Sequence, residues 1–455
     1  MTNLTKQLLQ TVEQSLAGHT QILLALSGGL DSRVLLHLLQ RWRTHLSGRS
    51  VRAIYIHHGL SAQADAWAIF CQQCCEGAEI TYECLPVQVI RRPRESLEAA
   101  ARTARYQALA QRVTYEEVIV TAHHQDDQCE TLLLALKRGS GPAGLAAMPA
   151  AQPFAGSQLC RPLLTVSRSY LHTYAQQHQL TWIEDPSNQL LQFDRNFLRQ
   201  QILPNLSVRW PQFTATVARS ARLCGEQEQL LDELLLPRLV SLMDTQGSLA
   251  IGPLLTESVL KRQALLRRWC HRVGAPTPNH QQLTQLWDRV ALSRRDANPQ
   301  LTINGWQVRR YRQRLYWIAP MAILPAQWVW QDWQQSITLP GELGRVGWHR
   351  VEPDKSASET MHSDWVRLPE PDQRVTWRFG ISGRFRVFGR GQRSLKKLYQ
   401  ERGVPPWLRS RLPALYYDEQ LIAIPGIAVT AAGAAKPNLS TGQLMWQPIG
   451  VVTWP

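Results

Sequence analysis

The stretch from Ile22 to Ser32, which reads ILLALSGGLDS, restricts the possible folds of this chain more than any other. Its first five residues form an unbroken apolar run, which is typical of a parallel strand buried on both faces. Ser27, Gly28 and Gly29 follow with a hydroxyl and with backbone N–H groups that no Cβ shields at the glycines. Because a helical pattern comes next, the stretch predicts an anion site at a helix N-terminus, and phosphate is the expected anion. A plain strand-to-helix turn with a serine cap is the alternative interpretation.

The six residues from Ser27 to Ser32 also narrow the kind of phosphate site. The chain contains no glycine-rich loop that ends in Gly-Lys-Ser or Gly-Lys-Thr, so a Walker-type loop is excluded. The SGGLDS sequence at a strand end resembles the pyrophosphatase loop of ATP-pyrophosphate lyases. That resemblance implies that ATP is cleaved between its α and β phosphates and that AMP passes to a carbonyl-type oxygen. It also implies the residues that bind ATP, with Asp31 as the Mg²⁺ ligand: Ser27, Gly28, Gly29, Leu30, Asp31 and Ser32.

Composition bounds the class of protein. At 455 residues, of which 44% are hydrophobic, the chain is long enough for two or three globular domains. No apolar run approaches the roughly 18 residues of a membrane span, and residues 1–20 are too polar for a signal peptide, so we expect a cytoplasmic protein without membrane contact. The eight cysteines are irregularly spaced and indicate no disulfide framework. A net charge of +15 predicts a polyanionic partner, and nucleic acid is the first candidate.

Two other features lie in the same predicted domain. The apolar run from Val51 to Ile56 predicts a strand, and His57 follows it at the sheet edge where nucleotides bind. The alanine-rich helix predicted from Glu98 to Tyr106 carries Arg102 and Arg105 three positions apart, and therefore on one face. These guanidinium groups are either solvated surface charges or ligands for a phosphate or a carboxylate.

A second functional centre follows the apolar run from Val118 to Ala122. The next nine residues read HHQDDQCET, which is more polar than the cap of a helix requires. His123 precedes Asp127 by four residues, and Asp127 and Glu130 lie three apart on one predicted helical face. Carboxylates placed in this way can bind Mg²⁺ or receive the cationic amine of a small substrate.

Six stretches of the chain, taken together, resemble one family within this superfamily. They are Ser27–Ser32, His57–Gly59, Glu98–Tyr106, His123–Thr131, Gly139–Gly144 and Glu184–Pro204. Their order and spacing are similar to those of the bacterial tRNA(Ile)-lysidine synthases. The resemblance implies that ATP and L-lysine are used to convert the wobble cytidine of a CAU-anticodon isoleucine tRNA to lysidine, with release of AMP and pyrophosphate. The modified tRNA then reads AUA instead of AUG.

The implied chemistry assigns roles to the residues already named. Attack of the cytidine carbonyl oxygen on the α-phosphorus requires positive charge, from Mg²⁺ held by Asp31 and from Arg102 or Arg105. The ammonium group of lysine must lose a proton before it attacks, and Asp127 and His123 are the candidate bases. Substrate contacts are expected from three further side chains: Glu130 (lysine or Mg²⁺), Asn196 and Arg199 (tRNA or closure of the site).

The second half of the chain is basic and predicts contacts with RNA. From Arg378 to Arg411 there are ten Lys or Arg residues and one acid. This part resembles the C-terminal domain of the same family, which implies binding of the acceptor stem by Lys396, Lys397 and Arg409. A basic helical region precedes it and suits contacts with the phosphate backbone.

The predicted fold class is α/β. A doubly wound parallel sheet of the adenine nucleotide alpha hydrolase type is expected in an N-terminal catalytic domain, residues 1–212. A helical domain that binds tRNA (213–325), a linker or short strands (326–363) and a small α+β domain that binds tRNA (364–455) follow. The sequence leaves open whether the chain forms a homodimer.

Three rival functions remain at this point. A tRNA thiolase with the same loop needs a persulfide-carrying cysteine, for which Cys129 and the cluster of Cys71, Cys74 and Cys75 are available. Helical spacing favours a core role for that cluster. A small-molecule synthetase of the superfamily does not need a basic second half. A non-catalytic RNA-binding protein needs the positive charge but not the acidic residues of the two predicted centres.

Overall fold

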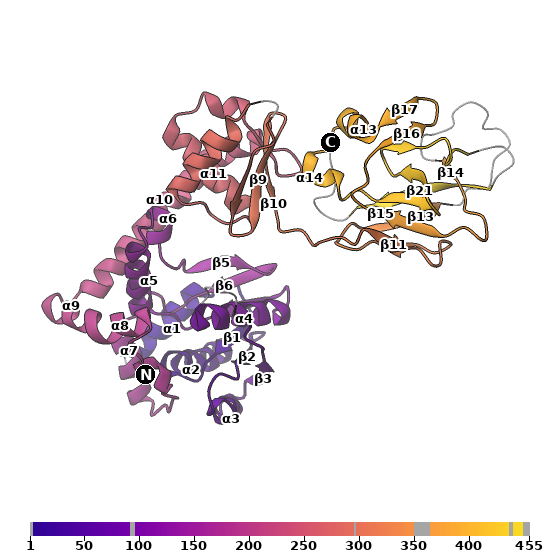
Figure 1. Cartoon of the computed structure of the whole chain (residues 1–455). Coiled ribbons are helices and arrows are strands. Elements are labelled where there is room, and N and C mark those ends of the chain that lie inside the picture. Colours follow the sequence, from indigo (N-terminus) through magenta and orange to yellow (C-terminus); the bar gives the residue numbers. More distant parts are fainter. Residues whose placement is uncertain (1–2, 92–95, 295–296, 350–364, 436–439, 449–455) are drawn as a thin grey trace. The chain divides into compact units, whose positions relative to one another are not determined.

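The computed structural model describes residues 3–91, 96–294, 297–349, 365–435 and 440–448 (Figure 1). The chain forms two compact units, Met1–Leu231 and Asp232–Pro455, and the division falls inside the long helix α10 (Phe213–Leu242). Among the described helices, none has both the length and the apolar character that crossing a membrane requires.

The N-terminal unit is built on a six-stranded sheet with the order β3-β2-β1-β4-β6-β5. Its strands are β1 (Gln21–Leu26), β2 (Ser50–His57), β3 (Thr81–Pro86), β4 (Glu117–Val120), β5 (Ala151–Phe154) and β6 (Ser157–Cys160). All pair in parallel except the edge strand β5, which runs antiparallel to β6. The strand order reverses direction between β1 and β4, so the sheet is doubly wound and the predicted fold class is confirmed. The antiparallel edge was not predicted, because two four-residue strands carry too little periodicity.

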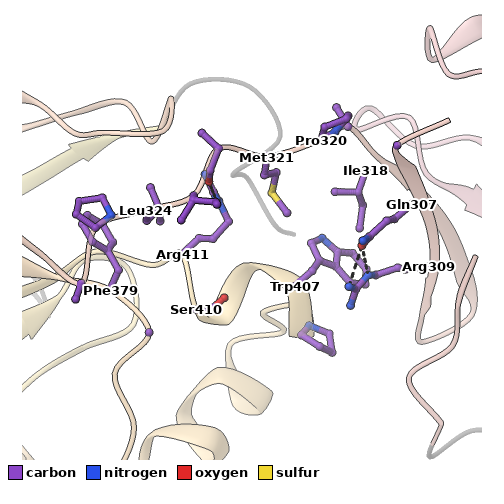
Figure 2. A pocket seen from close by; sticks show the side chains of 18 residues that line it. Gln307, Arg309, Ile318, Pro320, Met321, Leu324, Phe379, Trp407, Ser410 and Arg411 are labelled. Carbon is purple, nitrogen blue, oxygen red and sulfur yellow. Dashed lines mark hydrogen bonds between the residues drawn. The ribbon is translucent and has the colours of Figure 1, made fainter. Parts of the chain in front are cut away.

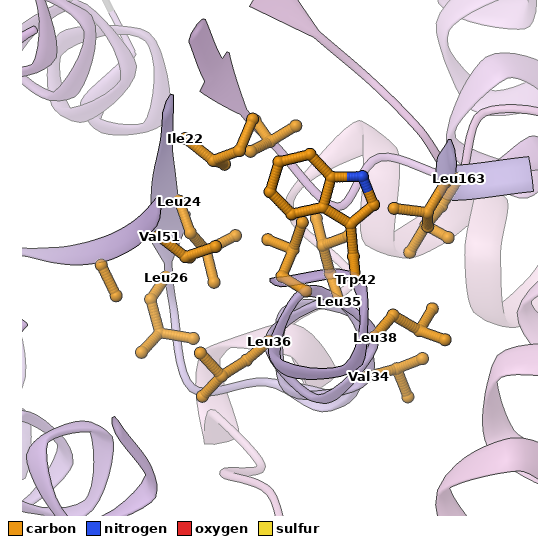
Figure 3. Close-up of a cluster of buried hydrophobic side chains, with 14 of the residues drawn as sticks. Ile22, Leu24, Leu26, Val34, Leu35, Leu36, Leu38, Trp42, Val51 and Leu163 are labelled. Carbon is orange, nitrogen blue, oxygen red and sulfur yellow. The ribbon is translucent and has the colours of Figure 1, made fainter. Parts of the chain in front are cut away.

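Helices pack against both faces of this sheet. Those that share a core with its strands are α1 (Asn3–Ser15), α2 (Leu30–His45), α3 (Ala64–Glu76) and α7 (Arg168–Gln177) on one face and α4 (Leu97–Arg112) on the other. The unit also contains α5 (Gln125–Lys137), α6 (Pro142–Leu145), α8 (Asp194–Phe197) and α9 (Leu203–Arg209), with short helices η1 (Pro186–Gln189) and η2 (Leu198–Ile202). Ile22, Leu24 and Leu26 of β1 pack with residues of α1, α2, α3 and α7 (Figure 3). Leu23 points to the opposite face and packs with Leu109 of α4. Both faces of β1 are therefore buried, which is why its sequence is apolar without alternation.

The second unit begins with helices and continues with a small sheet. The helices are α11 (Val259–Arg272), α12 (His280–Gln285), η3 (Gly252–Leu255) and η4 (Leu286–Ala291), and the strands are β7 (Leu249–Ala250), β8 (Gln300–Ile303), β9 (Trp306–Tyr311) and β10 (Arg314–Ile318). The strands form an antiparallel sheet in the order β7-β10-β9-β8, which shares a core with α11. The sequence predicted the helices but not this sheet.

The C-terminal part is rich in strands. They are β11 (Gln327–Val329), β12 (Ile337–Thr338), β13 (Arg345–His349), β14 (Trp365–Arg367), β15 (Val375–Arg378), β16 (Arg384–Val387), β17 (Gly391–Ser394), β18 (Ala414–Tyr417), β19 (Gln420–Ile424), β20 (Ala428–Val429) and β21 (Thr441–Gln447), with helices α13 (Leu395–Glu401) and α14 (Pro406–Arg409). β11 pairs with β15, and β13 pairs with β21. The described residues of the segment assigned to a linker or short strands thus form strands of the C-terminal sheets, whereas residues 350–363 lie outside the described residues.

Candidate active site

The turn between β1 and α2 is held by two serines. The backbone N–H of Ser27 donates to Ser32 Oγ at 3.3 Å, and the two hydroxyl oxygens lie 3.0 Å apart. Ser32 Oγ also donates to the carbonyl oxygen of Gly29 at 3.0 Å. Gly29 is the N-cap of α2 and supplies no side-chain hydrogen bond. The first N–H groups of this 16-residue helix therefore have no side-chain cap at Gly29, and the anion site at this helix end stays a prediction.

The two glycines of the loop are required for different reasons. Gly28 has a φ of +78°, and a Cβ there would lie 2.4 Å from Ile183 Cδ1 and 2.9 Å from Cys71 Sγ. The carbonyl oxygen of Gly28 also accepts a hydrogen bond from the N–H of Ile183 at 2.9 Å. Gly29 has an ordinary φ of −71°, and a Cβ there would meet no atom closer than 3.8 Å. Gly28 is thus required by its left-handed backbone and, in addition, by its close contact with the Ile183 and Cys71 side chains, whereas Gly29 leaves open space beside the loop.

A buried histidine connects this loop to the second predicted centre. His124, which is 1% exposed, lies at the start of α5 among three carboxylates. Its Nε2 is 3.5 Å from Asp31 Oδ2 and 3.4 Å from Asp127 Oδ2, and its Nδ1 is 3.6 Å from Asp126 Oδ2. The backbone N–H of His124 donates to Asp127 Oδ2 at 3.0 Å. The strand ends β1 and β4 thus meet through one side chain, as expected for the switch point of a doubly wound sheet.

The charges of this cluster support one another. Burial by itself would lower the pKa of His124, but the carboxylates around it raise that pKa to about 10, so the imidazole is positively charged at neutral pH. Burial would likewise raise the pKa of Asp31, yet His124 and nearby arginines bring it below its ordinary value. The same balance between burial and His124 lowers the pKa of Asp126. His124 and Asp126 were inside the predicted polar stretch but were not singled out, because sequence gives no distances.

Glu130, which is buried, and Arg199, which is half-buried, form an ion pair beside Asp127. Arg199 Nε donates to Glu130 Oε1 at 2.7 Å, and Arg199 Nη2 donates to Glu130 Oε2 at 3.0 Å and to Asp127 Oδ1 at 3.1 Å. Glu130 is fully buried, and burial raises the pKa of its carboxyl even though Arg199 opposes that rise. A two-pronged contact of this kind fixes both side chains in one geometry. The structure thus brings Glu130, Arg199 and Asp127 together, although they were predicted for separate tasks.

His123 lies in a different electrostatic setting from its neighbour. Its Nδ1 is 2.9 Å from Thr121 Oγ1. Burial, helped by the positive charges of Arg161, Arg102 and Arg105, lowers the pKa of His123 to about 4 against the opposing effect of Asp127. The imidazole is therefore neutral at neutral pH and has a nitrogen that can accept a proton. The two arginines of α4 are thus close enough to the predicted centre to act on it electrostatically.

His57 lies at the end of β2, as predicted. Its Nε2 is 3.1 Å from Asp65 Oδ1. His57 and its neighbour His58 line a cavity of about 490 Å³ together with Pro86 and Val87, at the carboxyl ends of β2 and β3. That is the edge of an open parallel sheet at which nucleotides bind.

The remaining predicted residues lie in other settings. Asn196 donates its amide hydrogens to the carbonyl oxygens of Ser187 and Leu190 at 2.9 and 3.0 Å, so it orders the segment before α8. Lys396 and Lys397 are exposed on α13 in the second unit. Arg409, at the end of α14, donates from Nε to the carbonyl oxygen of residue 404 at 3.0 Å.

One carboxylate of this site is a candidate ligand for a metal ion. Within the described residues, no group of three or more His, Cys, Asp or Glu side chains is arranged to hold one. Asp31 Oδ1 is nevertheless buried and has no hydrogen-bond partner among them. One free carboxylate oxygen beside an anion loop fits Mg²⁺, which proteins commonly bind through one or two carboxylates and the phosphates of a substrate.

The loop, the switch point and the ionised cluster define an ATP-binding protein of the PP-loop class. Family models agree: the PP-loop domain matches residues 1–206, the TilS substrate binding domain matches 249–316, and the TilS substrate C-terminal domain matches 375–446. The PP-loop match supports the use of ATP.

Similar proteins cover nearly the whole chain. The tRNA(Ile)-lysidine synthase of Serratia proteamaculans is 48% identical over 97% of this chain and 99% of its own length. The synthases of Pectobacterium atrosepticum and Yersinia pseudotuberculosis are 49% and 47% identical, over 97% and 96% of this chain and 98% of each relative. This chain belongs to the tRNA(Ile)-lysidine synthase family, and the family predicted from six stretches of sequence is confirmed.

Proposed function

We propose that this protein joins L-lysine to carbon 2 of the wobble cytidine in a CAU-anticodon isoleucine tRNA and consumes ATP to AMP and pyrophosphate. The observation that carries the proposal is the contact of His124 with both Asp31 and Asp127. Through this contact the loop, which suits chemistry at the α-phosphate, lies beside carboxylates that suit the binding of an amine. The two substrate-domain matches and the named relatives support tRNA(Ile) as the acceptor rather than the substrate of a thiolase.

In the first step, the N–H groups of the loop and the hydroxyls of Ser27 and Ser32 hold the pyrophosphate part of ATP. The cytidine carbonyl oxygen attacks the α-phosphorus, the bond to pyrophosphate breaks, and the base becomes adenylated. Arg102 and Arg105 stabilise the negative charge that develops there. Asp31 would hold Mg²⁺, which supplies further positive charge to the phosphates.

In the second step, the lysine ε-nitrogen attacks carbon 2 and AMP leaves. The lysine ammonium, with an ordinary pKa near 10.4, must first lose a proton. Asp127 and neutral His123 are the groups proposed to receive it, and Glu130 orients the amine. Because Arg199 bonds to both Asp127 and Glu130, it is proposed to set their geometry. Asn196 would act through the loop that it orders.

The test is the transfer of labelled lysine to tRNA in the presence of ATP. Label that enters tRNA(Ile) and survives mild alkali is expected, because lysidine is not an ester. Asp31→Asn and Asp127→Asn should lower the rate of transfer at least 100-fold and leave tRNA affinity within about twofold, as expected when a charge acts mainly in the transition state. Near-normal turnover by either variant, or an alkali-labile product, contradicts the proposal.

A further inference from the structure

The second unit contains a cavity of about 620 Å³ that none of the proposed steps uses (Figure 2). Gln307 and Arg309 of β9 line one side, together with Trp407 of α14, and Phe379 and Arg411 line the other. The segment 319–326, which connects β10 to β11, forms part of the rim. The cavity is thus built from the region matched by the substrate binding model, the region matched by the substrate C-terminal model, and the segment between them.

The cavity carries positive charge without acidic compensation. None of the described residues that line it is Asp or Glu, whereas two are arginines. Arg309 Nε and Nη2 both donate to Gln307 Oε1, at 3.0 and 2.9 Å, and this acceptor is neutral. Arg411 is 9% exposed and donates to the backbone carbonyl oxygens of residues 322 and 341. Burial lowers the pKa of both guanidinium groups. For Arg411 the charge of Glu342 opposes this effect, whereas burial is the one cause at Arg309.

An aromatic surface accompanies these cations. The Arg309 guanidinium carbon lies 5.9 Å from the centre of the Trp407 ring. The centroids of the Tyr316 and Trp407 rings are 5.2 Å apart. Phe379 is 8% exposed and lines the opposite wall. A partly buried cation without an acid, next to an indole, matches the two parts of a nucleotide, which are a phosphate and a flat base.

We propose that this cavity binds one unpaired nucleotide of the RNA substrate, with its phosphate at Arg309 and its base against Trp407. The volume lies within the range of about 300–1,000 Å³ typical of small-ligand sites. A nucleotide that is part of an RNA chain is favoured over a free nucleotide, because both walls of the cavity belong to regions matched by substrate-domain models. The inference rests on the proposed function in that the RNA is then the tRNA being modified.

Two substitutions test the site through its charge. Gln307→Glu places a carboxylate where the amide oxygen already accepts from Arg309, so it supplies the missing anion internally. Arg309→Gln removes the cation. Matched controls exist in the exposed turn that follows β9: Gln313→Glu and Arg312→Gln make the same charge changes outside the cavity. Thermal melting of each full-length variant checks that the fold is retained.

The probe is a fluorescein-labelled, unstructured RNA hexanucleotide, compared with a blunt RNA duplex and with AMP as competitor. Gln307→Glu and Arg309→Gln should weaken hexanucleotide binding by about tenfold, which is what loss of one charged contact costs. The salt dependence should fall by about 0.7 in logarithmic slope, as for one lost phosphate contact to a single strand. The controls and the blunt duplex should change by less than about twofold.

Each alternative outcome is decisive. If Arg309→Gln and Arg312→Gln weaken the hexanucleotide equally, the cavity is not the site. If AMP displaces the hexanucleotide at equal concentration, the ligand is a free nucleotide and the assignment to RNA is wrong. A third outcome is that the wild-type protein fails to transfer lysine to tRNA, while the two cavity variants bind the hexanucleotide more weakly and the two controls do not. The proposed function is then wrong and the nucleotide site is supported.

Discussion

Replacement of Gly28 and Gly29 by alanine, one at a time, distinguishes two interpretations of the loop, which are an anion-binding loop and a plain strand-to-helix turn. In the Gly28→Ala variant the new methyl group would overlap Ile183 Cδ1 at 2.4 Å, and the residue would keep a φ of +78°. The left-handed backbone costs about 1–2 kcal/mol for alanine, and overpacking adds about 1–3 kcal/mol. We therefore expect a loss of about 2–5 kcal/mol in local stability, from the sum of these two costs.

Gly29→Ala should behave in the opposite way. At a φ of −71° and with no atom closer than 3.8 Å, the methyl group meets neither strain nor a clash. The reduced freedom of the unfolded chain and the weaker N-cap nearly cancel, so stability should change by less than about 1 kcal/mol. The nearest atom to the methyl is Ser27 Oγ, which is proposed to bind pyrophosphate. ATP affinity should therefore fall by at least about tenfold, because the phosphate loses its close approach to the backbone.

Two assays read these effects independently. Hydrogen exchange of the amides in α2 reports local stability, and isothermal titration with Mg²⁺ and ATP in the absence of tRNA reports affinity. Gly18→Ala is a matched control for a glycine with positive φ, since its surroundings are open and it lies before β1. If Gly29→Ala binds ATP within twofold of the wild-type protein, no phosphate lies at the loop and a plain strand-to-helix turn is the correct interpretation.

Three further perturbations test other parts of the site. Arg199→Lys keeps the charge but loses the two-pronged contact with Glu130, so lysine transfer should fall by about tenfold or more in kcat/KM; wild-type kinetics would contradict its role. The charged form of His124 stabilises the fold fully below an unfolded pKa near 6.5 and loses this effect as pH rises through its folded pKa of about 10. The difference in Tm between the wild-type protein and His124→Gln should therefore shrink from pH 7 to pH 10, and a constant difference would refute the ion pairs. Replacement of Lys396 and Lys397 by Gln should lower the logarithmic salt slope of tRNA binding by about 2, and an unchanged slope would remove both from the RNA interface.

The sequence predicted the sheet and its loop because their signals are local. An unbroken apolar run followed by two glycines describes β1 and the start of α2 regardless of what packs around them. The requirement for Gly28 is different, since it depends on Ile183, which lies more than 150 positions away and contacts the loop only in the folded chain. A single sequence offers no means of finding such a contact. The small sheet of β7 to β10 was missed for a similar reason, because its strands are short and follow a clearly helical region.

The acidic centre shows the same limit in its chemistry. The stretch from His123 to Glu130 was recognised from its density of polar residues, and His123 was selected because it precedes Asp127 by one helical turn. The structure gives the two adjacent histidines opposite charge states: burial and nearby arginines keep His123 neutral, and three carboxylates keep His124 charged. Composition cannot separate them, because vicinal side chains of one type differ only in what surrounds them.

The structure brings charged residues of the two predicted centres together. Three carboxylates surround the single imidazolium of His124, namely Asp31, Asp126 and Asp127. The bidentate pair of Glu130 and Arg199 is neutral as a unit. Arg168 acts on Asp31, and Arg161, Arg102 and Arg105 act on the neighbouring His123. These arginines offset the carboxylates within the chain, but the phosphates of ATP add negative charge to the site. Mg²⁺ bound to ATP would offset the phosphates, and the ammonium group of lysine would pair with the carboxylates. ATP without a divalent cation should accordingly bind far more weakly than its Mg²⁺ complex, and lysine should bind more tightly than an uncharged analogue of the same length.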